Sequence, residues 1–337
     1  MKGLVVRNLG NLYQVRVGEK LYVCRLKGNF KLQGIRTTNP IAVGDWVSLE
    51  APLLSGEEQP QKHALFEGDQ QPLWIIGIEP RRNYIIRRAS NLSKQSHIIG
   101  ANLDRTLLVV TINYPVTSTT FIDRYLATAE AYGVPALLAF NKIDRYRYGD
   151  QLLLEQLVQL YEGIGYPCFR ISAKDGSGME QLRKVLAEGV TLLSGHSGVG
   201  KSTLINVLVP DAEMLTQEIS EAHNVGVHTT THSEMILLPS CENVEGEQVT
   251  DASQEAYLID TPGIKGFGTI EFDKQEVGHY FPEIFAQAKQ CYYSDCSHTH
   301  EPKCAVLEAL KRGEIATSRY QSYLSILEED EVVKYRL

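Results

Sequence analysis

The sequence Gly195-His196-Ser197-Gly198-Val199-Gly200-Lys201-Ser202 decides the fold of the central part of this chain. It matches the pattern G-x-x-x-x-G-K-S and stands between a predicted strand, Thr191–Leu193, and a helical pattern, Lys201–Leu208. Glycines at these positions let successive backbone N–H groups turn inward around phosphates, at the positive end of the helix dipole. A strand, a glycine-rich loop and a helix in this order predict a phosphate-binding site in an α/β sheet.

This loop is predicted to hold the phosphates of a nucleotide. Lys201 would reach the β- and γ-phosphates, and Ser202 would ligate a Mg²⁺ ion that offsets charge as the γ-phosphoryl group leaves. His196 stands at a variable position of the pattern and is predicted to be incidental to the chemistry. A chance glycine-rich turn is the alternative for the whole loop. The residues expected to contact the nucleotide here are Gly195, His196, Ser197, Gly198, Val199, Gly200, Lys201, Ser202 and Thr203.

A second motif, Asn141-Lys142-Ile143-Asp144, is expected to select the base. It follows the predicted strand Val134–Phe140, and ligands of open α/β sheets bind at the carboxyl ends of strands. The Asp144 carboxylate can accept hydrogen bonds from both N1–H and the exocyclic amine of guanine, a donor pair that adenine lacks. Ser172-Ala173-Lys174, after the strand Cys168–Ile171, is the companion loop whose backbone is expected to contact the guanine carbonyl. These loops predict GTP and GDP, rather than ATP, as ligands.

Two further segments are predicted to hold Mg²⁺ and to sense the γ-phosphate. Asp260-Thr261-Pro262-Gly263 ends an apolar strand; its Asp260 would hold the Mg²⁺ shell, and the N–H of Gly263 would meet the γ-phosphate. Thr229-Thr230-Thr231 is placed to supply the switch threonine, with Thr230 or Thr231 favoured. An ordinary β-favouring segment is the alternative for this threonine run.

The sequence leaves open which residue orients the attacking water. In Ras-like GTPases a Gln follows the glycine of D-x-x-G, whereas Ile264 stands there in this chain. An aliphatic side chain does not position water by hydrogen bonding, so intrinsic hydrolysis is expected to be slow. His228 and His232 are the candidates to replace it, and a surface or packing role is the alternative for each.

The motifs occur in circularly permuted order: base loop, companion loop, phosphate loop and then the two switch segments. All of them follow predicted strands of one sheet, so joining the old termini and opening the chain elsewhere preserves the site. The central domain is therefore predicted to be a permuted α/β P-loop GTPase with a parallel sheet. Its second switch runs within thirty residues into a Cys/His cluster, which suggests that nucleotide state is read out as a movement of that cluster.

That cluster predicts a metal site. Three of the six cysteines lie within fourteen residues, and with one histidine they form the set Cys291, Cys296, His298 and Cys304. Three thiolates and one imidazole make a closed tetrahedral set of the structural Zn²⁺ type. Loose thiols or a redox role are the alternatives, and His300 is an alternative to His298. The remaining cysteines, Cys24, Cys168 and Cys241, are predicted to be packing residues.

The first eighty residues are predicted to form a small β-barrel from the strands Lys2–Asn8, Leu12–Val17, Lys20–Leu26 and Trp46–Leu49. An OB-fold, which commonly binds oligonucleotides, and an SH3-like module both fit this spacing. Although the whole chain has a formal charge of −8, residues 1–40 hold eight Lys or Arg and one acid. A second basic stretch holds Arg81, Arg82, Arg87, Arg88 and Lys94. This local excess predicts RNA binding, and a solvated charged face is the alternative.

The sequence also predicts a cytosolic protein. No apolar stretch approaches the ~18 residues needed to span a bilayer. The N-terminus turns polar within a few residues and lacks the apolar region of a signal peptide.

These features together resemble the bacterial ribosome small-subunit-dependent GTPase A (RsgA) family. The resemblance rests on the permuted order, the basic N-terminal barrel, the His228-Thr229-Thr230-Thr231 switch and the C-x4-C-x-H-x5-C cluster, and it spans nearly the whole chain. It implies an OB-fold over residues 1–81, a permuted GTPase domain over 82–270 and a mostly helical zinc-binding domain over 271–337. It also implies a cytoplasmic monomer that contacts rRNA and engages the small ribosomal subunit late in assembly, with the ribosome stimulating GTP hydrolysis. The family often has Arg before the switch histidine, where this chain has Val227.

Two other functions stay open at this point. One is an RNA-binding scaffold whose nucleotide is structural; the intact Lys201, Ser202 and Asp260 argue against it. The other is a GTP-driven metal chaperone, which the closed ligand set of the cysteine cluster disfavours.

Overall fold

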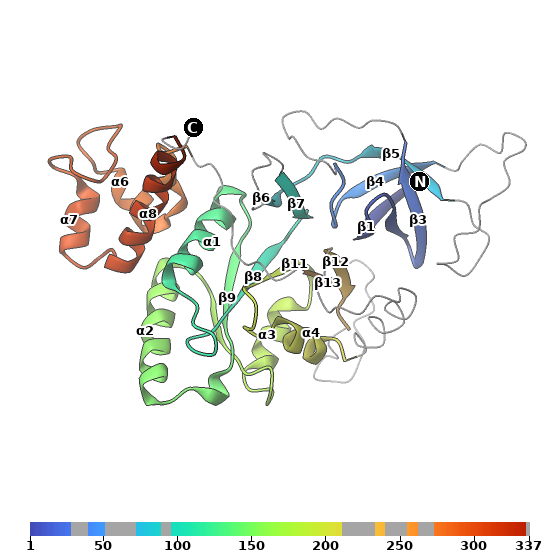
Figure 1. Cartoon of the computed structure of the whole chain (residues 1–337), viewed down its shortest axis with the longest axis horizontal. Coiled ribbons are helices and arrows are strands. Elements are labelled where there is room, and N and C mark those ends of the chain that lie inside the picture. Colours follow the sequence, from blue (N-terminus) through green and yellow to red (C-terminus); the bar gives the residue numbers. More distant parts are fainter. Residues whose placement is uncertain are drawn as a thin grey trace, which may run out of the picture. The chain divides into compact units, whose positions relative to one another are not determined.

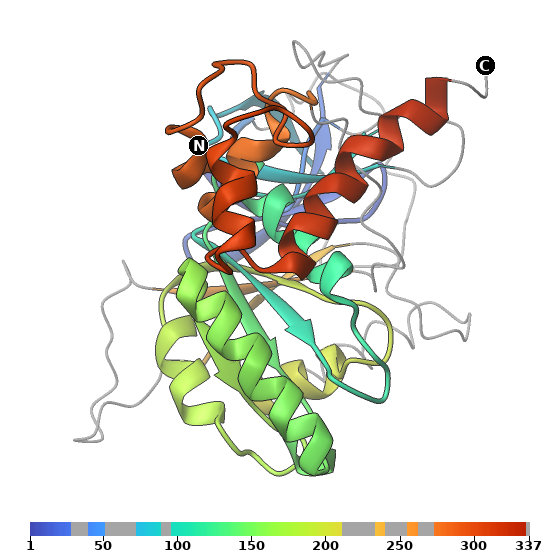
Figure 2. The same cartoon turned by 90° about the vertical axis from the view of Figure 1, so that its left-hand side faces the viewer.

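The computed structural model describes residues 1–27, 40–50, 72–88, 96–210, 233–239, 255–261 and 273–334. Figures 1 and 2 draw these residues as a coloured ribbon. They form two compact units. The first comprises the described residues within 1–104, 183–193 and 202–263, and the second those within 105–182, 194–201 and 264–337.

The first unit begins with a five-stranded barrel, drawn in blue and cyan in Figure 1. Its strands are β1 (Lys2–Asn8), β2 (Tyr13–Val17), β3 (Lys20–Leu26), β4 (Trp46–Glu50) and β5 (Leu73–Ile78). They pair in the order β1-β2-β3-β5-β4, and a β1–β4 pairing closes the barrel. Only the β3–β5 pair is parallel among these pairings. Alternate residues such as Val5, Val15 and Val47 point inward and are fully buried. This topology is that of an OB-fold and excludes the SH3-like alternative.

The first unit also holds part of the α/β sheet. Strand β11 (Gly189–Ser194) pairs in parallel with β13 (Ala256–Asp260). Strand β12 (Glu234–Leu237) runs antiparallel to β13, so the prediction of a wholly parallel sheet is wrong at this strand. An antiparallel strand at one side of a mostly parallel sheet is common in α/β folds. The helix α4 (Lys201–Leu208) has the bounds that the sequence predicts.

A hairpin that the sequence analysis did not predict lies between barrel and sheet along the chain. Strands β6 (Tyr84–Arg88) and β7 (Ser96–Ala101) pair antiparallel, with Tyr84 opposite Ala101. Two arginines within five residues mask the strand pattern of β6 in the sequence. Gly44 lies against this hairpin with a φ of +92°, and a Cβ there would stand 2.1 Å from the carbonyl oxygen of Ala101. A side chain at this position would clash, which explains the glycine.

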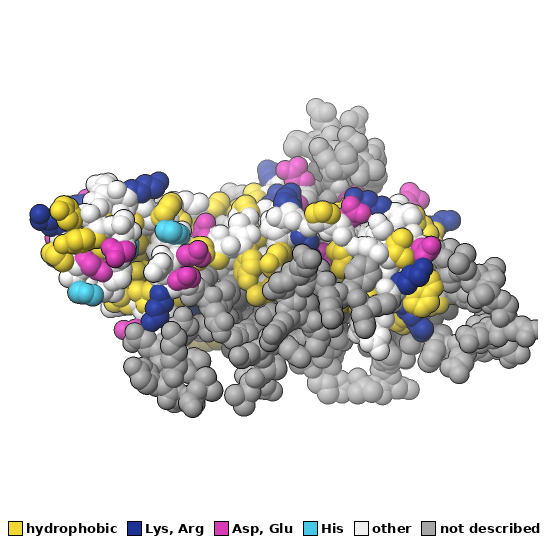
Figure 3. Space-filling model, turned by 90° about the horizontal axis from the view of Figure 1, so that it is seen from above, with side chains coloured by type: hydrophobic (Ala, Val, Ile, Leu, Met, Phe, Trp, Pro, Cys, Tyr) yellow, Lys and Arg dark blue, Asp and Glu magenta, His cyan; other side chains and the backbone are white. Residues whose placement is uncertain are grey.

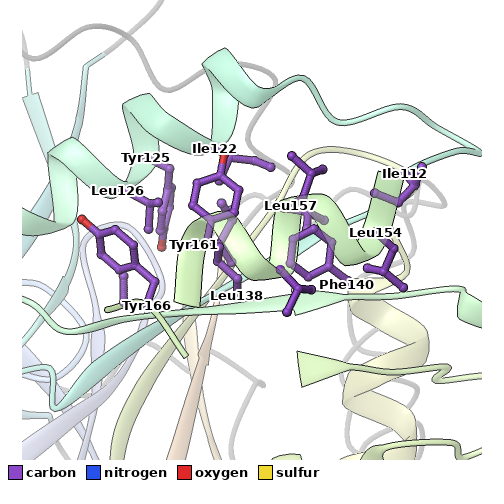
Figure 4. Packing of buried hydrophobic residues seen from close by; sticks show 14 of the residues in the cluster. Ile112, Ile122, Tyr125, Leu126, Leu138, Phe140, Leu154, Leu157, Tyr161 and Tyr166 are labelled. Atoms are coloured by element: carbon purple, nitrogen blue, oxygen red, sulfur yellow. The ribbon is translucent and has the colours of Figure 1, made fainter. Parts of the chain in front are cut away.

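The second unit contains the parallel strands β8 (Arg105–Val110), β9 (Ala136–Phe140) and β10 (Cys168–Arg170). Helices α1 (Thr119–Ala131) and α2 (Tyr148–Ile164) cover one face of them, and the helix α3 (Met179–Leu186) follows β10. Figure 4 shows the core between these layers, where Ile122 and Tyr125 of α1 and Leu154, Leu157 and Tyr161 of α2 converge on Leu138 and Phe140 of β9. This core fixes the carboxyl ends of β8, β9 and β10, from which the predicted base loops emerge.

Helix α2 is capped at both ends. The helix begins at Tyr148 because the Asp150 carboxylate accepts the backbone N–H of Arg147. Gly165, which has a φ of +117°, caps its C-terminus after Ile164.

The C-terminal part of the second unit is helical, as predicted. It contains the 3₁₀ turn η2 (Val277–Tyr280) and the helices α6 (Pro282–Ala288), α7 (Ala305–Lys311) and α8 (Thr317–Lys334). Figure 2 shows α8 as the long red helix. Their shared core includes Phe281, Ile284, Val306 and Tyr323 and extends to Ala127 of α1. These helices therefore pack against the same helix, α1, that covers the strands of the base-binding half. Among the described residues, no helix is both long enough and apolar enough to cross a membrane.

Candidate functional site

The phosphate loop follows β11 and opens α4, as the sequence predicts. Three of its glycines, Gly195, Gly198 and Gly200, have positive φ values of 147°, 86° and 100°. A Cβ at Gly200 would stand 2.5 Å from Nδ2 of Asn141, and one at Gly195 would stand 2.5 Å from the carbonyl oxygen of Val109. The Lys201 ammonium donates to the carbonyl oxygens of Gly195 and His196 at 2.5 and 3.0 Å. The backbone of the loop therefore surrounds the Lys201 ammonium. At Gly195 and Gly200 a side chain would clash with neighbouring atoms.

Asn141 joins the base motif to this loop. Its side chain is buried, and Nδ2 donates to the Val199 carbonyl oxygen at 2.8 Å. Its Oδ1 accepts the backbone N–H groups of Lys142 at 2.8 Å and Ala173 at 3.0 Å. One amide therefore fastens together the base loop, the companion loop and the phosphate loop, although Val199 is 58 residues away in sequence. The Ala173 N–H, part of the backbone predicted to meet guanine, is engaged by Asn141 in this structure.

The side chains of Lys142 and Asp144 are each held by hydrogen bonds. Lys142 has a φ of +67°, and its ammonium donates to the carbonyl oxygens of Tyr114 and Gly198 at 2.6 and 2.5 Å. Burial lowers the pKa of Lys142, with a further decrease from the nearby Arg145 charge. Asp144 is exposed, and its Oδ1 accepts the hydroxyl of the buried Ser172 at 2.9 Å. This hydrogen bond orients a solvent-facing carboxylate, which is the group that guanine recognition requires.

Of the predicted magnesium-shell residues, the structure describes Ser202 and Asp260, together with Thr261, which follows Asp260 in the chain. Asp260 ends β13 opposite Leu193 of β11, and the Thr261 hydroxyl donates to the Leu193 carbonyl oxygen at 2.9 Å. The phosphate loop begins two residues after Leu193. The other predicted switch residues, His228, Thr229, Thr230, Thr231, His232, Gly263 and Ile264, lie outside the described residues.

The predicted metal ligands come together in the segment between α6 and α7. One ligand atom from each of Cys291, Cys296, His298 and Cys304 lies within 4.8 Å of all the others. The sulfurs of Cys291 and Cys304 are 3.9 Å apart. The distance to Nδ1 of His298 is 3.6 Å from the Cys291 sulfur and 3.5 Å from the Cys304 sulfur. Two sulfurs bound tetrahedrally to one zinc lie about 3.8 Å apart, and a sulfur and a nitrogen about 3.6 Å. The cluster fits zinc, with Nδ1 as the imidazole ligand.

The protonation of this cluster also suits a metal. Burial lowers the pKa of His298, which keeps the imidazole neutral and able to ligate. Burial raises the pKa of Cys296 to about 12 and also raises that of Cys304, so these thiols need a cation to ionise at neutral pH. His300, the alternative ligand, is exposed and its Nδ1 lies 2.8 Å from the Thr299 hydroxyl, so it is not part of the cluster.

Glu301 organises the loop that carries His298. Its carboxylate accepts the backbone N–H groups of Ser297 at 2.7 Å, Thr299 at 3.0 Å and His300 at 3.2 Å. Burial alone would raise the pKa of Glu301, but these hydrogen bonds and one from the Ser297 hydroxyl lower it to about 2. The carboxylate is therefore ionised throughout the neutral range and holds the ligand loop closed.

Replacing Glu301 by alanine is expected to weaken zinc binding about tenfold, because loss of a group that orients a ligand typically costs this much. Competition with a chromophoric chelator measures the zinc affinity of the full chain. Glu308→Ala is the matched control, since Glu308 makes an exposed ion pair with Lys311 on α7. Equal zinc affinities for both variants would contradict the role given to Glu301.

A buried ionic network, which the sequence analysis missed, joins the C-terminal helices to the base-binding half. Arg319 of α8 and Asp123 of α1 are both fully buried and 2.9 Å apart. Arg319 also donates twice to Glu283 of α6, at 2.6 and 3.1 Å. Asp123 accepts the hydroxyls of Ser322 at 2.6 Å and Tyr161 at 2.9 Å. In the sequence, the only indication that Asp123 faces the core is that it stands beside the apolar residues of α1.

Most basic residues of the described barrel have acidic partners. The ion pairs are Lys2–Glu79, Arg7–Glu234, Arg16–Glu255, Lys27–Glu50, Arg81–Asp45 and Arg82–Asp104. On the face drawn in Figure 3, basic and acidic side chains lie interspersed over the described surface. Within the described part of the barrel, Lys20 and Arg25 of β3 have no acidic partner. The side chains of Arg87 and Arg88, and Lys94, lie outside the described residues.

Comparison with known proteins assigns the chain to a family. The model of the RsgA GTPase domain matches residues 78–270, and that of the RsgA N-terminal domain matches residues 2–53. The chain belongs to the RsgA GTPase family. Among its relatives is the small ribosomal subunit biogenesis GTPase RsgA of Porphyromonas gingivalis, which is 56% identical over 100% of this chain and 99% of its own length.

Two solved structures support the same assignment. YjeQ from Thermotoga maritima is 30% identical, covers 97% of each chain and has a TM-score of 0.70. YloQ, described as a circularly permuted GTPase, is 25% identical, covers 100% of this chain and 96% of its own, and has a TM-score of 0.65. The permuted motif order predicted from the sequence is thus confirmed. As an RsgA GTPase the protein hydrolyses GTP, and membership of the family implies GTP, GDP and Mg²⁺ as ligands.

Proposed function

We propose that this protein is a GTP-hydrolysing biogenesis factor that acts late in the maturation of the small (30S) ribosomal subunit. In this proposal the subunit stimulates hydrolysis, the factor contacts rRNA, and it works as a monomer in the cytoplasm. The observation that carries the nucleotide part is the Asn141 amide, which holds the base loop against the phosphate loop at 2.8 Å. The name of the 56% identical relative supports the ribosomal part.

The proposed roles of the site residues follow from their chemistry. Asn141, Lys142, Ile143, Asp144, Ser172, Ala173 and Lys174 form the guanine site. Residues 195–203 bind the phosphates, Lys201 neutralises charge on the β- and γ-phosphates, and Ser202 and Asp260 hold the Mg²⁺ shell. Bound Mg²⁺ bridges the phosphates and stabilises the charge that develops on the leaving group. Thr230 or Thr231, Gly263, and His228 or His232 complete the site in this proposal.

We further propose three domains, an RNA-binding OB-fold over 1–81, the GTPase domain over 82–270 and a zinc-binding domain over 271–337. The buried contact of Arg319 with Asp123 supports a zinc domain that is fastened to α1. The predicted readout of nucleotide state by that domain would therefore involve α1 as well as the second switch.

Because the other basic residues of the described barrel are in ion pairs, we propose that the rRNA contact lies at β3. Arg25 lies directly opposite Trp74 of β5, and both Arg25 and Lys20 are exposed. A cation beside an aromatic ring, as at Arg25, suits a phosphate backbone with a stacked base. Lys20, opposite Val17, adds a second exposed cation on the same strand. Basic residues already engaged by carboxylates contribute less to phosphate binding.

The double variant Lys20→Glu/Arg25→Glu is expected to bind small subunits more weakly and with a shallower salt dependence. Loss of two phosphate contacts lowers the slope of log affinity against log salt by about 2. Cosedimentation with purified subunits over a range of salt concentrations measures both quantities. The control Lys27→Glu alters a residue that pairs with Glu50. An equal effect of the control would place the contact elsewhere.

The proposed function as a whole is tested by GTP turnover with and without purified small subunits. We expect small subunits to raise the turnover well above the isolated rate, and large subunits to have no such effect. Absence of stimulation by any ribosomal particle would count heavily against the ribosomal role. That result would not contradict the assignment of the protein as a GTPase.

A further inference from the structure

His196 of the phosphate loop makes contacts on three sides. Its Nε2 lies 2.7 Å from the Thr117 hydroxyl oxygen, and its Nδ1 lies 3.1 Å from the carbonyl oxygen of Ser197. The edge of the ring packs against Phe121 of α1, with 5.6 Å between ring centroids and an angle of 87° between the planes. A half-buried imidazole with two hydrogen-bond partners and one aromatic neighbour is held in a single orientation.

The partners determine which nitrogen of His196 carries the proton. A carbonyl oxygen only accepts, so Nδ1 must be the N–H that donates to Ser197. In the neutral ring Nε2 then has a lone pair, and the Thr117 hydroxyl donates to it. The imidazole therefore joins the backbone of the phosphate loop on one side to Thr117 on the other.

Thr117 is itself fixed to the end of β8. Its hydroxyl oxygen accepts the backbone N–H of Thr111 at 3.0 Å, and its own N–H donates to the Thr111 carbonyl oxygen at 2.9 Å. The side chain of Thr117 is buried. Because Thr111 directly follows the core strand β8, these hydrogen bonds tie the partner of His196 to the end of the sheet.

The same segment, residues 111–118, contacts the phosphate loop a second time. The Lys142 ammonium bridges the carbonyl oxygens of Tyr114 and Gly198. A Cβ at Gly198 would stand 3.4 Å from Cδ of Pro115, so Gly198 lies close to the proline ring. The first half of the phosphate loop is thus held at His196 and at Gly198, both times against segment 111–118.

We propose that His196 is a positioning residue for nucleotide binding, which fastens the phosphate loop to Thr117 in the conformation that receives phosphates. This inference rests on the proposed nucleotide site. A loop whose N–H groups already point inward loses less conformational entropy when phosphate binds, so the fastening increases affinity. Because the His196 ring is engaged by Thr117, Ser197 and Phe121, we expect it to act on nucleotide binding through the conformation of the loop.

Equilibrium binding of GDP and steady-state GTP turnover by the full chain test the proposal. The variants are His196→Ala, His196→Gln, Thr117→Val, Thr117→Ser and the double variant His196→Ala/Thr117→Val. We expect His196→Ala and Thr117→Val each to weaken GDP binding about tenfold, the equivalent of one hydrogen bond. The double variant should lose no more than either single variant, since both remove the same contact. Thr117→Ser keeps the hydroxyl and should bind GDP like the wild type, and the KM for GTP should rise in each variant whose GDP binding weakens.

Three results would overturn the proposal: wild-type GDP affinity in His196→Ala, losses that multiply in the double variant, or equal losses for Thr117→Ser and Thr117→Val. Thermal unfolding without nucleotide identifies a variant that fails to fold. If Thr117→Val fails, comparison of His196→Ala with His196→Gln decides, because only Gln keeps a polar group at the Nε2 position, and equal losses would again overturn the proposal. Absence of GDP binding by the wild type would refute the nucleotide site itself. Wild-type binding that His196→Ala leaves unchanged refutes only the role of His196.

Discussion

Replacing Lys201 by alanine is expected to reduce kcat/KM for GTP by at least about a hundredfold, the scale of removing one preorganised charge-stabilising donor. In the structure its ammonium lies at the centre of the phosphate loop, 2.5 Å from the Gly195 carbonyl oxygen. In the proposed nucleotide site the same group would neutralise charge that develops on the transferred phosphoryl group. Release of inorganic phosphate, with and without small subunits, measures the effect.

The matched control for this experiment is Lys311→Ala. Lys311 is an exposed lysine of α7 that pairs with Glu308, far from the phosphate loop in sequence. Its replacement is expected to leave GTP turnover unchanged. Full activity of Lys201→Ala would mean that the nucleotide at this loop is structural. The alternative function, an RNA-binding scaffold with a structural nucleotide, would then be favoured.

Replacing Arg319 by methionine is expected to lower the free energy of unfolding by about 3–5 kcal/mol. The variant leaves Asp123 buried without its cation, and it also removes the two hydrogen bonds to Glu283. Burial already raises the pKa of Asp123 despite the attraction of Arg319. A buried carboxylate without this partner is costly whether it stays charged or takes up a proton.

Chemical denaturation monitored by circular dichroism measures the loss, with Arg312→Met as its control. Arg312 makes an equally close pair with Glu314, at 2.7 and 2.8 Å, but both side chains are exposed. Exposed pairs contribute about 0–1 kcal/mol, so the control should change stability little. Similar losses in the two variants would show that burial does not set the strength of the Arg319 network.

Local sequence patterns predicted several elements closely. Strands β1 and β3 and helix α4 have the bounds that their sequence patterns indicate. The four ligands of the metal cluster were also found from spacing alone, because a short loop brings nearby cysteines together whatever the rest of the fold does. Where the periodicity was ambiguous, as at the arginine-rich strand β6, the hairpin partner β7 decided the structure.

Charge is the property that the sequence predicted least well. The excess of basic residues in 1–40 indicated an RNA-binding surface, yet Arg7 and Arg16 pair with Glu234 and Glu255, more than two hundred residues later. Sequence composition does not contain the distances that decide which cation meets which carboxylate. The folded barrel leaves Lys20 and Arg25 as the described candidates for a phosphate contact.

The sequence by itself determined the chemistry of this protein and the permuted order of its nucleotide loops. It did so because a strand, a glycine-rich loop and a helix form from neighbouring residues, and because the N-K-x-D carboxylate is specific for guanine. The tertiary structure decided how these parts are held. Asn141 meets Val199, His196 meets Thr117 and Arg319 meets Asp123 across 58, 79 and 196 residues. Such hydrogen bonds and ion pairs depend on distances that exist only after the core has packed.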